Sequence, residues 1–259
     1  MKVEIFMTQA TIFFGHGSPM NAIEDNQFSR QWREIGASLP QAKAILVVSA
    51  HYETDGVKIA CSQNQKTIHD FYGFPDELFA VQYPARGDFV LARRIIEILG
   101  EGEIDENWGL DHGAWSVLVH THPQPKMPIL QLSLDRKKSA QEHYDLAKKL
   151  AVLRDEGVLI ITSGDIVHNL RAINWGGGAY DWAQKFNDEI VAAIVQKDHE
   201  KVINFATLDG AKMAVPTNEH FLPLLYLLAL QRDSDKTEIF NNEIDLGSIS
   251  MTGIMFSED

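Results

Sequence analysis

The sequence predicts an α/β fold with three layers, in which helices cover both faces of a central sheet that is mostly parallel or mixed. Short apolar runs rich in β-branched residues alternate along the chain with longer segments of helical period. No repeat recurs at a period of about 20–50 residues, and no Gly/Ser/Pro-rich linker divides the chain. We therefore expect one catalytic domain over residues 1–259.

Six strands and six helices follow from these patterns. The predicted strands are Thr11–Phe14, Ala44–Ser49, Val57–Ala60, Ile129–Ser133, Val158–Thr162 and Ser248–Phe256. The predicted helices are Gln27–Ser38, Phe89–Leu99, Gly113–His120, Ala140–Glu156, Tyr180–Gln196 and His220–Leu230. Gly157 is expected to close the fourth helix with a positive φ, and Cys61 is expected to be a buried strand residue.

Composition narrows the class of partner. The formal net charge of −13 argues against broad attraction to nucleic acid or to an anionic membrane, so we expect small molecules as partners. No apolar run reaches the roughly 18 residues of a membrane span, and the first 14 residues lack the apolar core and cleavage site of a signal peptide. A single cysteine excludes an internal disulfide framework, and we expect a cytoplasmic protein.

Four of the ten histidines lie where ligands bind in open α/β sheets. His16 follows the strand TIFF, His51 follows AILVVSA, and His168 follows VLIITSGDIV. His112 lies in the aromatic-flanked turn WGLDHGAW. Any one of them could be a half-buried imidazole without function. Together they indicate a metal site, because neutral imidazole binds zinc, iron, copper and nickel.

Two further residues extend this hypothesis to the apolar segment HFLPLLYLLAL. Thr217 or Asn218 is the expected N-cap of its helix, so the first turn would present Glu219 and His220. A histidine or a carboxylate there would complete a three-ligand metal site. The alternative is that Glu219 only complements the positive end of the helix dipole.

One loop, TIHDFYGFP, is dense in aromatic residues. It carries His69, Phe71 and Tyr72, and these are the candidate substrate-binding residues. Such a loop is suited to lining a pocket for an aromatic substrate. An aromatic cluster that only ties down a long loop would have the same composition.

Eight segments occur in the order in which one known family carries them. They are FFGHGSPMN, VVSAHYET, TIHDFYGFP, YPARGD, WGLDHGAW, PILQLSL, SGDIVHNLR and PTNEHFLPLLY. From about Thr11 to the C-terminus the chain resembles the class III extradiol ring-cleavage dioxygenases, specifically the 4,5-DOPA dioxygenase branch of the LigB-like superfamily. One segment could arise by chance, whereas eight in order form a specific signal.

The resemblance implies an enzyme that inserts both atoms of O2 into a catechol-type, DOPA-like substrate and opens the ring to a semialdehyde. It implies one divalent ion per chain, Fe(II) or Zn(II), held by His16, His51 and His220. His168 would be a fourth metal ligand or the acid/base residue, and His112 the other active-site histidine. Because related enzymes use two histidines and a glutamate, Glu219 stays an alternative to His220.

Two other functions fit the same residues. A zinc-dependent hydrolase would use the three histidines and an activated water to attack an ester, amide or phosphate. A non-catalytic metal- or ligand-binding protein would use the fold without chemistry, although the presence of both His112 and His168 argues against it. The sequence leaves the oligomeric state open.

Overall fold

The computed structural model describes residues 7–258. Residues 1–6, part of the segment inspected for a signal peptide, and residue 259 lie outside this range. The strands are β1 Thr11–Gly15, β2 Ala44–Thr54, β3 Lys58–Ala60, β4 Glu103–Asp105, β5 Ile129–Asp135, β6 Val158–Gly164, β7 Lys236–Phe240, β8 Ile244–Asp245, β9 Ile249–Ser250 and β10 Gly253–Ser257. The α-helices are α1 Gln27–Ser38, α2 Asp76–Phe79, α3 Phe89–Leu99, α4 His112–Thr121, α5 Ala140–Lys148, α6 Ala151–Asp155, α7 Asp181–Val195, α8 His199–Ile203, α9 Ala211–Ala214 and α10 Leu222–Ala229.

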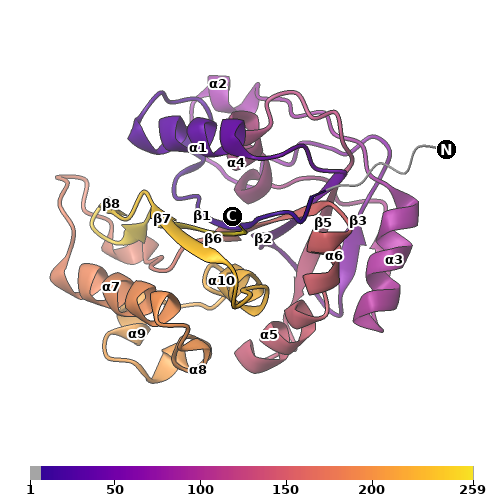
Figure 1. The fold of residues 1–259 in the computed structure, drawn as a ribbon. Helices are drawn as coiled ribbons and strands as arrows, with labels where there is room; N and C mark the ends of the chain where they lie inside the picture. Colours follow the sequence, from indigo (N-terminus) through magenta and orange to yellow (C-terminus); the bar gives the residue numbers. More distant parts are fainter. Residues whose placement is uncertain (1–6, 259) are drawn as a thin grey trace.

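Within the described residues a mixed sheet of eight strands, in the order β4-β3-β5-β2-β6-β1-β10-β7, forms the middle layer. Strands β5, β2, β6 and β1 are parallel neighbours, whereas β10 and β7 continue the sheet in antiparallel pairing. Helices α1, α2 and α4 lie on one side of the sheet, and α5, α7, α8, α9 and α10 lie on the other (Figure 1). The predicted three-layer α/β/α fold is confirmed.

Successive side chains of the strands pack alternately into two hydrophobic clusters, one on each face of the sheet. In β2, Leu46 and Val48 pack into the cluster that includes α5 and α10, whereas Ile45 and Val47 pack into the cluster that includes α1 and α4. Successive side chains of a strand point to opposite faces, so a strand covered on both sides is apolar throughout. This explains the unbroken apolar run AILVV.

Four of the predicted elements differ from the structure in length or continuity, for reasons that the structure shows. Strand β2 continues five residues beyond Ser49, so His51 lies within the strand, next to a register shift between Val48 and Glu53. The predicted helix Ala140–Glu156 is two helices, α5 and α6, because bonds from residue i to residue i−3 tighten the chain at residues 149–150. Gly157 has the expected positive φ of 82°.

The other two differences lie near the C-terminus. The predicted strand Ser248–Phe256 is interrupted between β9 and β10, where the hydroxyls of Ser250 and Thr252 donate to Asn187 of α7. Helix α10 begins at Leu222, without the predicted side-chain cap from Thr217 or Asn218. Pro223 is tolerated only in the first turn of a helix, so His220 lies in the turn before it. Cys61 is buried as expected but follows the last residue of β3.

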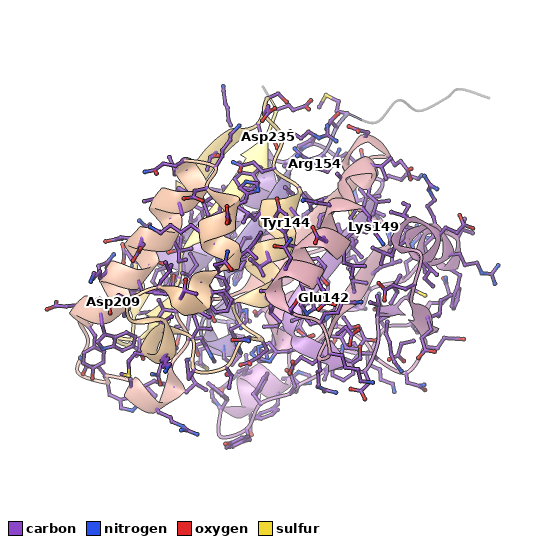
Figure 2. All side chains as sticks on the ribbon, turned by 90° about the horizontal axis from the view of Figure 1, so that it is seen from below. Glu142, Tyr144, Lys149, Arg154, Asp209 and Asp235 are labelled. Atoms are coloured by element: carbon purple, nitrogen blue, oxygen red, sulfur yellow. The ribbon has the colours of Figure 1, made fainter. Side chains whose placement is uncertain are left out.

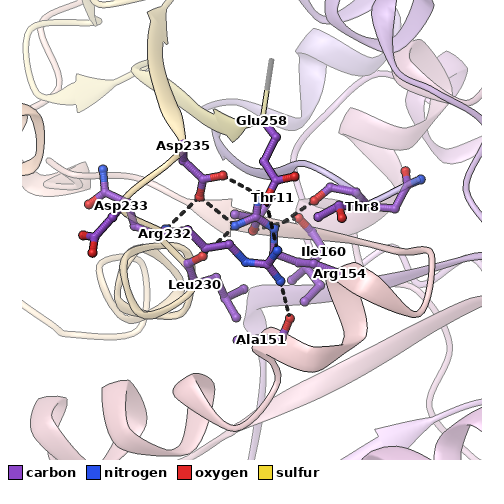
Figure 3. Close-up of polar contacts among 12 residues, drawn as sticks. Thr8, Thr11, Ala151, Arg154, Ile160, Leu230, Arg232, Asp233, Asp235 and Glu258 are labelled. Atoms are coloured by element: carbon purple, nitrogen blue, oxygen red, sulfur yellow. Dashed lines mark hydrogen bonds and ion pairs between the residues drawn. The ribbon is translucent and has the colours of Figure 1, made fainter. Parts of the chain in front are cut away.

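A buried ion pair fixes the end of the sheet where β1 and β6 begin. The guanidinium of Arg154 donates to both carboxylate oxygens of Asp235, at 2.7 and 2.8 Å, and to the carbonyls of Gln9 and Leu230. Both charged side chains are fully buried. Figure 2 labels the two residues, and Figure 3 shows the polar contacts around them. Residues 7–258 contain no helix with the length and apolar character of a membrane span.

Candidate metal centre

The site forms at the carboxyl ends of the parallel strands. His16 directly follows β1 and His51 lies in β2, and the end of β6 lies between these two strands. The turn before α10 passes very close to this edge. If Gly164 carried a Cβ, that atom would lie 2.2 Å from the carbonyl oxygen of His220. A glycine at the end of β6 therefore lets His220 approach the sheet.

Three imidazoles that the sequence places far apart meet there. The ring centres lie 5.1 Å apart for His16 and His51, 5.3 Å for His16 and His220, and 4.9 Å for His51 and His220. Three imidazoles that share one ion through Nε2, at about 2.0–2.1 Å, have ring centres about 5 Å apart. The separations in this structure therefore suit one ion.

Hydrogen bonds determine where the protons of these rings lie. The hydroxyl of Ser163 donates to the carbonyl of Gly113 at 2.5 Å, so it has to accept from His16 Nδ1 at 3.0 Å. His51 Nδ1 lies 3.2 Å from a carboxylate oxygen of Asp70. These two contacts favour the tautomer of each ring that carries its proton on Nδ1 and leaves a lone pair on Nε2.

His220 is held in the same way. Its Nδ1 lies 3.1 Å from the carboxylate of Glu219. The Nε2 atoms of His16 and His51 are only 3.2 Å apart, so either one ring donates to the other or, with both protons on Nδ1, two lone pairs face each other. Two lone pairs facing each other at this distance repel unless a cation lies between them. The residues present therefore fit a divalent metal ion.

Burial keeps these imidazoles neutral, as a metal requires of its ligands. Burial lowers the pKa of His16 and of His220 well below the usual value, and neighbouring histidines add to the effect. The pKa of His51 falls to about 3, first because of burial and then because of His112. Protons therefore do not compete with a metal ion near neutral pH.

Asp70 connects two of the histidines. Its Oδ2 lies 3.2 Å from His51 Nδ1 and 3.0 Å from His112 Nδ1, while its Oδ1 accepts from the backbone N–H of His112. Burial acts to raise the pKa of Asp70, but the bond with His112 and the charges of both histidines bring it to about 2. One carboxylate therefore orients both His51 and His112.

Within residues 7–258, three sets of acidic and histidine side chains have ligand atoms within 4.8 Å of one another. These sets are His16, His51 and His112; His16, Asp165 and His220; and His168, Glu219 and His220. The predicted triad extends over the first two sets, which share His16. The five histidines singled out by the sequence thus lie in one continuous cluster.

His168 stacks on His220, with ring centres 3.5 Å apart and planes 8° from parallel. Two parallel rings at this separation direct their nitrogen lone pairs along parallel planes rather than to one point. Burial lowers the pKa of His168 to about 4. The stacking holds His168 against His220 and thus beside the histidine cluster.

The candidate substrate residues differ in position. Phe71 contacts the ring of His112, with centres 5.5 Å apart. His69 packs on Trp115, and its Nε2 bonds to the carbonyl of Val81 at 3.0 Å. Tyr72 is 92% exposed. Phe71 is therefore the candidate that directly adjoins the histidine cluster.

Three polar residues of the site were not selected from the sequence. They are Asp70, Ser163 and Asp165. The sequence could have indicated Ser163 and Asp165, since both come after the apolar residues of β6 just as His16 comes after those of β1. Nothing local indicated which histidine each of them would contact.

Comparison with known proteins defines the class. Residues 10–256 match the family described as the catalytic LigB subunit of aromatic ring-opening dioxygenase. The chain belongs to this family and is an extradiol ring-cleavage dioxygenase, which confirms the predicted resemblance.

Relatives cover nearly the whole chain. A 4,5-DOPA dioxygenase extradiol from Escherichia coli K12 is 41% identical over 251 residues, which are 94% of this chain and 93% of that protein. A protein of the same name from Beta vulgaris is 38% identical over 259 residues, covering 95% and 96% of the two chains. The crystal structure of an uncharacterized E. coli K12 protein aligns with a TM-score of 0.85 at 36% identity, covering 96% of this chain and all of that one.

Proposed function

We propose that this enzyme cleaves a catechol with a DOPA-like side chain, inserting both atoms of O2 and opening the ring to a semialdehyde. The observation that carries the proposal is the convergence of three imidazoles, each of which has a polar side chain in contact with its Nδ1 atom. The relatives named 4,5-DOPA dioxygenase support the DOPA-like substrate.

One divalent ion, Fe(II) in the active enzyme or Zn(II) as an alternative, would be held by His16, His51 and His220. The contact of Glu219 with His220 Nδ1 supports His220 as the ligand and Glu219 as the residue that orients it. When bound, the ion supplies Lewis acidity and a redox path between catechol and O2. His112 and His168 would lie beside the bound ion and its substrates.

His168 is proposed as the acid/base residue. Its stacking on His220 supports a position beside the substrate, and an imidazole there can take a phenolic proton and return it later. His112 is proposed to orient the substrate; its backbone N–H donates to Asp70, whose other carboxylate oxygen lies 3.0 Å from His112 Nδ1. A positioned acid/base residue contributes typically about 10²–10⁴-fold to the rate.

Around the ion, Phe71 is proposed to contact the catechol ring, with His69 and Tyr72 forming the loop around it. The chain is proposed to be one catalytic domain over residues 1–259, working in the cytoplasm on a small aromatic substrate and O2. The match to the family over residues 10–256 supports a single domain.

The test is anaerobic reconstitution of the metal-free enzyme with Fe(II), followed by addition of O2 and a panel of catechols that includes DOPA. We expect equimolar consumption of O2 and DOPA and a yellow ring-opened product. Protein loaded with Zn(II) and the variant His16→Ala, which lacks one proposed ligand, are the controls. Ester or amide hydrolysis by the Zn(II) protein without ring opening by the Fe(II) protein would contradict the proposal.

A further inference from the structure

Asp165 carries a buried carboxylate oxygen that lacks a partner among the described residues. The side chain is fully buried and follows the end of β6. Its Oδ1 accepts from the backbone N–H of Gly17 at 3.1 Å, while its Oδ2 accepts no hydrogen bond there. This Oδ2 lies 3.8 Å from Nε2 of His16, the nitrogen that the outer hydrogen bond leaves free.

The backbone fixes Asp165 between two segments of the site. Its N–H donates to the carbonyl of His220 at 2.8 Å, and the N–H of His16 donates to the carbonyl of Gly164 at 3.1 Å. The ligand atoms of Asp165, His16 and His220 lie within 4.8 Å of one another. The carboxylate is therefore held beside two of the proposed ligands by the same hydrogen bonds that hold those ligands together.

The geometry leaves this oxygen without a hydrogen-bond donor. Gly17 donates to Oδ1 only, and Nε2 of His16 presents a lone pair when its proton is on Nδ1. A buried polar atom without a partner is costly. A divalent ion in the histidine cluster would give Oδ2 a partner.

We propose that Asp165 is a fourth protein donor, through Oδ2, to the ion held by His16, His51 and His220. The inference rests on the proposed metal centre. It adds an anionic oxygen to three neutral nitrogens, so the ligand set becomes one that suits iron(II) and other oxygen-seeking ions better than a site of nitrogen alone. It also gives the buried carboxylate a reason to be there.

The test measures metal binding without turnover. Metal-free wild type and Asp165→Asn would be titrated with Co(II), whose visible absorption reports its ligands, and with Zn(II) in competition with a chelator. The amide keeps the shape of the side chain and the acceptor for Gly17 but removes the charge. We expect affinity to fall by about 10–100-fold or more and the Co(II) spectrum to change.

Asp135→Asn is the matched control, because Asp135 is also a buried carboxylate that accepts backbone N–H bonds, from Gly56 and Lys137, but at the end of β5. This control should bind both metals like wild type. Asp165→Ser, which keeps a small acceptor for Gly17, replaces Asp165→Asn if the metal-free amide variant melts below the wild type.

The outcomes separate the two proposals. Equal affinity and an unchanged Co(II) spectrum in the Asp165 variants would overturn the role of Asp165 while leaving the histidine centre in place. Wild type that binds no more Co(II) than His16→Ala would overturn the metal centre itself and this inference with it. Weakened binding and a changed spectrum in the Asp165 variants alone supports Asp165 as a donor.

Discussion

Single protons decide what the residues of this site can do. Ser163 has one hydroxyl proton and gives it to Gly113, so His16 must donate its Nδ1 proton to Ser163. Carboxylates accept only, so Asp70 and Glu219 favour the same proton position on His51 and His220. The three partners would thus leave three Nε2 lone pairs free for the proposed metal ion.

The role of His168 is testable at this scale. We expect His168→Ala to retain most of its metal while catechol turnover falls by about 10²-fold or more, because a positioned acid/base residue is lost. Metal content and turnover would be measured on the same sample of the Fe(II) enzyme. The control is His199→Ala, since His199 bonds to Tyr144 and Gln231 away from the cluster.

Two other results for His168→Ala have clear meanings. Lost metal would make His168 a fourth ligand. Unchanged metal together with unchanged turnover would remove His168 from the mechanism.

At the scale of elements, the ends of strands bring the site together. Helices α1 and α3 have the boundaries that the sequence predicts, because a polar residue caps each N-terminus: Asn26 for α1 and Asp88 for α3. The extension of β2 past Ser49 was missed, since HYET breaks the apolar run that marks the strand. Where a strand reaches a functional site its residues become polar, so a prediction from hydrophobic periodicity ends the strand too early.

Glycine at the end of β6 is predicted to be essential for assembling the metal centre. In Gly164→Ala the new Cβ would meet the His220 carbonyl at 2.2 Å, so the turn before α10 must move away. We expect at least a tenfold loss of Co(II) affinity and a lower melting temperature. Gly176→Ala is the control, because its nearest atom in an exposed loop is 3.3 Å away. Normal Co(II) affinity in Gly164→Ala would show that His220 does not depend on this close approach.

The whole molecule separates stability from chemistry along the strands. The buried pair of Arg154 and Asp235 lies where β1 and β6 begin, and the histidines lie where these strands end. Ion pairs of this kind are strongly destabilising to break, because the remaining charge stays buried. The two ends of the sheet should therefore respond separately to mutation.

This separation predicts the behaviour of Arg154→Met. We expect the free energy of unfolding to fall by about 3–5 kcal/mol, because Asp235 is left buried without its partner. Metal affinity should not change. Denaturant unfolding and Co(II) titration measure the two quantities. The double variant Arg154→Met/Asp235→Leu should recover part of the stability, and a single variant as stable as wild type would contradict the prediction.

Acid should destabilise the fold through histidines outside the metal centre. Burial lowers the pKa of His143 and of His122 to about 4, against about 6.5 in an unfolded chain. Between these values the unfolded state binds more protons, so stability is complete above about pH 6.5 and is lost as the pH falls toward 4. The loss is about 3 kcal/mol for each histidine.

The variant His143→Asn isolates one of these contributions. It keeps a polar partner for the hydroxyl of Tyr226, which lies 3.0 Å from His143 Nδ1. We expect its free energy of unfolding, measured in denaturant between pH 7 and pH 4, to change less with pH than that of wild type. Identical pH dependence in the two proteins would show that His143 is not the group that titrates.

The sequence by itself determined the layers and the residues that meet at the site. Alternating periods specify strands and helices, and apolar runs such as those of β2 and β6 specify strands buried on both faces. Histidines at the ends of such strands had to lie at one edge of the sheet, because parallel strands end together. The family followed from eight segments in order.

Only the tertiary structure decided how the polar side chains pair. Asp70 contacts His51 and His112 across 19 and 42 positions of the chain, and Asp165 contacts His16 across 149. No local pattern encodes such contacts, since they depend on strand order and on side-chain direction at the strand ends. Glu219 and His220, the two alternatives for the third ligand, likewise meet in a turn, where the carboxylate contacts His220 Nδ1. Sequence pattern specifies which residues arrive at the edge of the sheet, and packing specifies which atoms face one another there.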